Sequence, residues 1–147
     1  MNSPQPYLTV ASILSGFCIS VFMFRIQRKL SVRDRHPDWP NWLAWADYLI
    51  VATIVLSVVL VILPLVAVPA PGRAIYSVAA GACAAASLML LAYPFAILDH
   101  YRIEIGARRG EKPQARHKGE PIERIIVVTA GSVAAITFAA IVFAWNH

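Results

Sequence analysis

Residues 49–63 read LIVATIVLSVVLVIL and contain no charged residue, glycine or proline. When the segment is extended back to residue 43, only Asp47 interrupts its apolar character. At 1.5 Å per residue, residues 43–63 form a helix of about 31 Å, which matches the hydrocarbon thickness of a bilayer. The stretch therefore predicts a transmembrane helix.

Three other segments have a comparable apolar length, and the composition of the whole chain agrees with them. The chain has 147 residues, of which 59% are hydrophobic and 14% charged, and its mean hydropathy is +0.62. Soluble proteins are on average about half apolar and a quarter charged. We therefore expect an all-α integral membrane protein, a single four-transmembrane-helix bundle over residues 1–147. Its expected spans are 7–24, 43–63, 74–98 and 122–145.

The basic residues predict the orientation of this bundle. Twelve of the thirteen Lys and Arg residues lie in 25–35 and 102–124, and the exception is Arg73. Because cytoplasmic connections are enriched in Lys and Arg, the loops 25–42 and 99–121 are expected inside and both termini outside. Anionic lipid headgroups are the expected partner of these charges, rather than nucleic acid. With no signal peptide at the start, the inner (plasma) membrane of a bacterium is the expected location.

Four ionisable residues are predicted to lie at the inner ends of the spans. They are Arg25, Asp47, Asp99 and His100. If the helices pack together, these side chains form one polar cluster that faces the cytoplasm. One interpretation is a set of salt bridges that fixes the helix register. The other is a proton or ion site, because histidine titrates near neutral pH.

Small residues recur at helical spacing and predict where helices approach closely. In lipid, small side chains allow two backbones to come together. The expected packing residues are Ser12, Gly16, Ser20, Ser77, Gly81, Ala85 and Gly131. The span 43–63 has almost no small residues, so we expect it to face lipid and to end at Pro64.

Tryptophans mark the expected membrane interfaces, because their rings prefer the headgroup layer. Three crowd the start of the second span and one lies near the end of the fourth. These interfacial anchors are Trp39, Trp42, Trp45 and Trp145.

No motif points to catalysis. The chain has no HExxH, no GxSxG and no phosphate-binding glycine loop, and Cys18 and Cys83 are isolated inside apolar segments. We therefore expect no catalytic, metal or cofactor site. The expected function is that of a non-catalytic subunit, either a homo-oligomer or an accessory to another membrane protein. The alternative is a small transporter or pore that uses the polar cluster, and a third hypothesis, a lipid-acting enzyme using His100, has no motif behind it.

Overall fold

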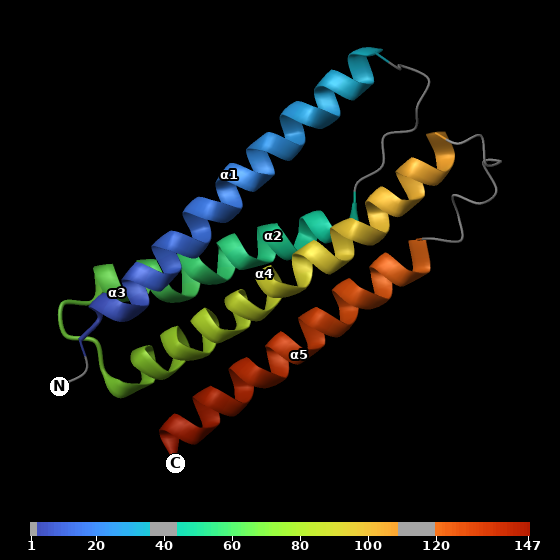
Figure 1. Cartoon of the computed structure of the whole chain (residues 1–147). Helices are drawn as coiled ribbons and strands as arrows, with labels where there is room; N and C mark the ends of the chain where they lie inside the picture. Colours follow the sequence, from blue (N-terminus) through green and yellow to red (C-terminus); the bar gives the residue numbers. More distant parts are fainter. Residues whose placement is uncertain (1–2, 36–43, 109–119) are drawn as a thin grey trace.

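The computed structural model describes residues 3–35, 44–108 and 120–147, with side chains described for 3–31, 44–98 and 122–147. Within these ranges the chain is helical and has no strand. The elements, in order, are α1 (Gln5–Arg35), α2 (Trp45–Val55), the π-helix η1 (Leu56–Ile62), α3 (Leu63–Ala67), α4 (Arg73–Arg108) and α5 (Glu120–Asn146) (Figure 1). The elements α2, η1 and α3 follow one another directly and form one long helix.

Among the described residues, four helices are long and apolar enough to cross a membrane, which confirms this part of the sequence-based prediction. Their apolar segments are Gln5–Ser31, Trp45–Ala67, Arg73–Leu98 and Ile122–Asn146. The helices extend beyond the expected spans, because α1 continues to Arg35 and α4 to Arg108. Part of each expected loop, 25–42 and 99–121, is therefore helical.

The helices alternate in direction, so the bundle has two chemically different ends. Figure 1 shows both chain termini and the α3–α4 turn at one end, which we call the terminal end. At the other end α1 and α4 finish and α2 and α5 begin. We call this the charged end, because Arg25, Arg28, Lys29 and Arg124 lie toward it whereas Arg73 begins α4 at the terminal end.

The central helix of the bundle is α4. It packs along α5, and on its other sides it contacts α2, η1 and α1. Most of its buried positions are alanine, and Ser77 and Gly81 are also small, so neighbouring helices can approach its backbone closely. Helices α1 and α5 lie on opposite sides of the pair formed by α4 and the α2–η1–α3 helix (Figure 1).

The second apolar helix is more central than its composition predicts. We expected residues 43–63 to face lipid, but α2 contacts α1, α4 and α5, and η1 contacts both α1 and α4. One face of the helix does point outward, since Val51, Val55 and Val59 are exposed. The opposite face was missed because its few small residues, Ala46, Thr53 and Ser57, are all buried and allow the alanines of α4 to pack closely against it.

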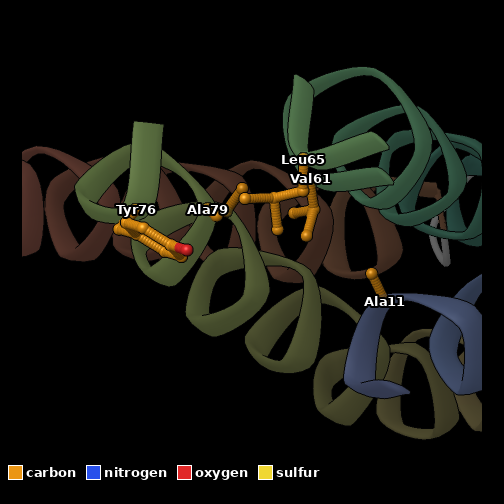
Figure 2. Packing of buried hydrophobic residues seen from close by; sticks show 6 residues of the cluster. Ala11, Val61, Leu65, Tyr76 and Ala79 are labelled. Carbon is orange, nitrogen blue, oxygen red and sulfur yellow. The ribbon is translucent and has the colours of Figure 1, made fainter. Parts of the chain in front are cut away.

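A hydrophobic core closes the terminal end. Figure 2 shows Val61 and Leu65 of the second apolar helix beside Ala79 and Tyr76 of α4, with Ala11 of α1 nearby. Ala11, Val61 and Ala79 are completely buried. This core joins the helices that meet at the terminal end mainly through apolar packing, with one weak 3.9 Å hydrogen bond from Cys83 Sγ on α4 to Tyr7 O on α1.

A buried row of residues explains why the second helix contains a π segment. The row is spaced by four residues and consists of Leu49, Thr53, Ser57, Val61 and Leu65. In a regular α-helix each step of four residues drifts by about 40° around the axis. A π-helix has more residues per turn, so η1 compensates for this drift and keeps the row on one face.

The π segment also carries the helix past Pro64. We expected the span to end there, but α3 continues to Ala67. Proline cannot donate a backbone hydrogen bond, and its ring clashes with the carbonyl four residues earlier. Local π geometry relieves both problems, because it shifts each backbone N–H to the carbonyl five residues earlier. Leu63 N–H accordingly donates to Val58 O and not to Val59 O, the acceptor in a regular α-helix.

Candidate functional site

Polar side chains from all four apolar helices meet at the charged end. Arg25 and Lys29 come from α1, where a spacing of four residues puts them on one face. Asp47 lies in the first turn of α2, Tyr93 on α4 and Glu123 on α5. We call these five residues the charged cluster.

Asp47 is the centre of the charged cluster. Its Oδ1 atom lies 2.7 Å from Arg25 Nε, and its Oδ2 atom accepts a 2.7 Å hydrogen bond from Lys29 Nζ. The side chains of Asp47 and Arg25 are 7% and 10% exposed, whereas that of Lys29 is 37% exposed. The Nε–Oδ1 contact is a close ion pair without hydrogen-bond alignment. One buried carboxylate is thus neutralised by a buried cation and supported by a partly exposed one.

Arg25 extends the charged cluster to a third helix. Its Nη1 atom donates a 3.2 Å hydrogen bond to the hydroxyl oxygen of Tyr93 on α4. A guanidinium presents several donors in one plane and can therefore hold a carboxylate and a hydroxyl together. Through Arg25, the helices α1, α2 and α4 are fixed relative to one another.

Glu123 joins the fourth helix to the charged cluster by capping α2. Its Oε1 atom accepts a 2.9 Å hydrogen bond from the backbone N–H of Ala46, and the Glu123 side chain is buried. The N-cap residue of α2, Ala44, has no side chain that can bond to the free N–H groups of the first turn. Glu123 lies in the first turn of α5, where a negative charge suits the dipole of its own helix, and the structure shows that it also caps α2.

An aromatic pair lies beside the charged cluster on the outer face of α2. The ring centroids of Trp45 and Tyr48 are 5.7 Å apart, and both side chains are exposed. The guanidinium carbon of Arg124, from α5, lies 5.3 Å from the centroid of the Trp45 ring. This is a cation–π contact between α2 and α5.

The structure brings together two of the four residues that we expected to form the inner polar cluster. Arg25 and Asp47 form an ion pair, whereas Asp99 and His100 belong to α4 but their side chains lie outside the described residues. Lys29, Tyr93 and Glu123 were not expected. The spacing of Arg25 and Lys29 was a usable signal, because both face Asp47 from consecutive turns of α1.

The expected packing row of α1 points away from the bundle. Ser12, Gly16 and Ser20 are all exposed, and a Cβ atom added at Gly16 would meet nothing within 4 Å. The buried residues of α1 are instead Ala11, Ser15 and Cys18. Against the described residues, the row therefore contributes little packing.

The packing row of α4 behaves differently. Ser77, Gly81 and Ala85 are buried, and a Cβ atom at Gly81 would lie 3.0 Å from Phe138 Cδ2 and 3.1 Å from Phe138 O. Gly81 thus allows the close approach of α4 and α5. Gly131, by contrast, is half-buried, and a Cβ atom added there would meet nothing within 4 Å.

The tryptophans expected as anchors occupy both ends of the bundle. Trp45 lies at the charged end under Arg124, and Trp145 packs against the hydrophobic core at the terminal end. Trp39 and Trp42 lie outside the described residues.

Hydroxyl groups inside the helices bond mostly to their own helix. Ser15, Thr53 and Ser77 donate to Ala11 O, Leu49 O and Ala74 O, each at 2.8 Å. The buried Ser57 hydroxyl is the exception, because it has no hydrogen-bond partner. Among the described residues, no group of three or more His, Cys, Asp and Glu side chains is placed to hold a metal ion.

No protein-family model matches the chain, and no curated protein and no solved structure shows significant similarity to it.

Proposed function

We propose that this chain is a small non-catalytic protein of a bacterial inner membrane and a subunit of a larger membrane assembly. The charged end lies in the cytoplasm and both termini lie outside. The length of α1 supports this depth, because Arg25 is about 30 Å along the helix from Gln5, which is the hydrocarbon thickness of a bilayer. The four basic residues near the charged end agree with the positive-inside rule.

The observation that carries the subunit role is the outward direction of the small-residue row of α1. Ser12, Gly16 and Ser20 gain little by facing lipid tails, which pack equally well against larger side chains. Facing another helix, the same row allows close backbone contact. Because α1 lies at the edge of the bundle and uses other residues to pack inward, this face is available to a second protein or a second copy.

In this proposal the charged cluster is a structural joint rather than a reaction centre. Its charges are already paired: Asp47 holds Arg25 and Lys29, and Glu123 caps α2. The joint fixes the register of four helices whose other end is held by apolar packing. A rigid bundle of this kind can present the α1 face to a partner in a defined orientation.

The alternative is a small transporter or pore that uses the charged cluster. The buried Asp47 favours it, since charged residues in membrane helices often mark ion pathways. The hydroxyl groups of Ser12, Ser20, Thr129 and Ser132 do not support a path through the bundle, because all four are exposed on its outer surface.

The subunit role is tested by native mass spectrometry of the protein extracted in native-like lipid. We expect a homo-oligomer or a complex with one other membrane protein at a fixed ratio. Gly16→Leu should break this complex without unfolding the chain, because nothing surrounds Gly16. The control Ala135→Leu, at an exposed position of α5, should leave it intact. A monomer without a partner, or a Gly16→Leu complex of unchanged mass, contradicts the proposal.

The orientation is tested separately with single cysteines in a variant that lacks Cys18 and Cys83. Gly72→Cys, in the turn before α4, should react with a membrane-impermeant thiol reagent in intact cells. Ser31→Cys, exposed near the end of α1, should react only after the cells are permeabilised. The reverse pattern would show that the charged end lies outside.

A further inference from the structure

The basic residues at the charged end are not equally available to a ligand. Arg25 and Lys29 are both bound to Asp47. Arg124 is exposed, and within residues 3–31, 44–98 and 122–147 its contact is the face of Trp45 rather than a carboxylate. Of these three cations, Arg124 is therefore the one whose charge is left for an anion.

We propose that Trp45, Tyr48 and Arg124 bind the phosphate of an anionic phospholipid. These three residues form what we call the headgroup site. The proposal rests on the membrane insertion of the chain but not on its role as a subunit. The Arg124 guanidinium lies over the face of the Trp45 indole, and a planar guanidinium can donate two parallel hydrogen bonds to a phosphate.

The aromatic pair gives the headgroup site its position relative to the bilayer. Trp45 and Tyr48 lie in the first turn of α2, side by side and exposed. Aromatic residues with a polar edge concentrate at the level of the lipid headgroups. The Arg124 guanidinium is therefore held at the depth where lipid phosphates lie, rather than in the aqueous loop region.

Below the aromatic pair, the same helix face suits an acyl chain. Val51, Val55 and Val59 follow Tyr48 at helical spacing, and they are 40%, 49% and 49% exposed. Ile125, which follows Arg124 on α5, is also exposed. A lipid whose phosphate binds Arg124 can thus lay its tail along an apolar surface, which a soluble phosphate compound cannot use. This continuity favours a lipid as the occupant.

The test is a lipid titration of the purified full-length protein in detergent, with bound lipids counted by native mass spectrometry. Phosphatidylglycerol and phosphatidylcholine with identical acyl chains are compared. We expect a preference for phosphatidylglycerol that falls about fivefold in Arg124→Gln, the effect of one basic residue near an anionic lipid surface. Trp45→Leu should weaken the preference as well, because the guanidinium loses its support. Arg73→Gln, a matched change at the terminal end, should not alter it.

Two results would overturn the headgroup site. The first is an Arg124→Gln variant that keeps the wild-type preference for phosphatidylglycerol. The second is an equal loss of both lipids, because phosphatidylcholine carries the same phosphate, and an equal loss shows that Arg124 does not select the net negative charge of an anionic lipid. The titration counts lipids bound to each chain in detergent, so a negative result does not affect the assembly experiment with Gly16→Leu. A negative assembly experiment likewise leaves the headgroup site untouched.

Discussion

Replacing Asp47 with Asn should destabilise the bundle more than any other single change at the charged end. The substitution keeps the size of the side chain but leaves Arg25, which is 10% exposed, without its counter-charge. Removing one partner of a buried ion pair typically costs about 3–5 kcal/mol. Since the cluster lies at a helix end, we expect the lower value, about 3 kcal/mol, which is roughly a hundredfold in the unfolding equilibrium.

The comparison with Lys29 makes this value testable. Lys29→Gln removes the second cation that pairs with Asp47. Because the Lys29 side chain is 37% exposed, water can replace its contact, and the free energy of unfolding should fall by under about 1 kcal/mol. The double variant Arg25→Met with Asp47→Leu should recover much of the stability, because no buried charge is left unpaired.

The assay is reversible unfolding in mixed micelles, followed by the helical circular dichroism signal. From most to least stable, the expected order is wild type, Lys29→Gln and Asp47→Asn. The double variant Arg25→Met with Asp47→Leu should be more stable than Asp47→Asn. If Asp47→Asn is no less stable than Lys29→Gln, the buried ion pair with Arg25 does not hold the charged end together. If the double variant is the least stable, the contribution of the pair exceeds that of apolar packing.

Three further changes probe the rest of the bundle. Gly81→Ala should lower the free energy of unfolding by about 1 kcal/mol, because the new methyl group lies 3.1 Å from a backbone oxygen of α5. Gly16→Ala should be neutral or stabilising, because a Cβ atom there meets nothing within 4 Å. Thermal unfolding of the two variants ranks them. Glu123→Gln keeps an oxygen for the cap of α2 and should retain more stability than Glu123→Ala, by about 1 kcal/mol in the same unfolding assay. Ser57→Ala removes a buried hydroxyl without a hydrogen-bond partner and should stabilise the bundle by about 1 kcal/mol. Thr53→Val breaks a 2.8 Å hydrogen bond and should not stabilise it. A destabilised Ser57→Ala variant would show that the Ser57 hydroxyl is hydrogen-bonded.

The positions of the helices were predictable because a transmembrane segment is defined by local sequence. The fifteen uncharged residues at 49–63, apolar except for Thr53 and Ser57, predict a spanning helix whatever surrounds them. Helix ends were less predictable, and Pro64 shows why. The rule that proline ends a helix considers the chain alone, whereas η1 shifts the hydrogen bonds before Pro64 and lets the helix continue.

The candidate site was predictable only in part. Arg25 and Asp47 were found because charges near apolar spans are rare, and each draws attention by itself. The capping role of Glu123 was not predictable, because its hydrogen bond from Ala46 N–H depends on where α5 meets α2. The row Ser12, Gly16 and Ser20 shows the same limit, since small-residue spacing predicts a packing face but not the partner that it faces.

Helix length, hydropathy and charge are properties of contiguous residues, so four apolar helices with the basic residues grouped between them follow from the order of the amino acids. The central place of alanine-rich α4 and the outward direction of the small residues of α1 do not follow from it. Neither does the pairing of Asp47 with two cations, nor the capping of α2 by Glu123. These features depend on the rotation of each helix about its own axis, and that rotation is set by the packing of all four helices at once.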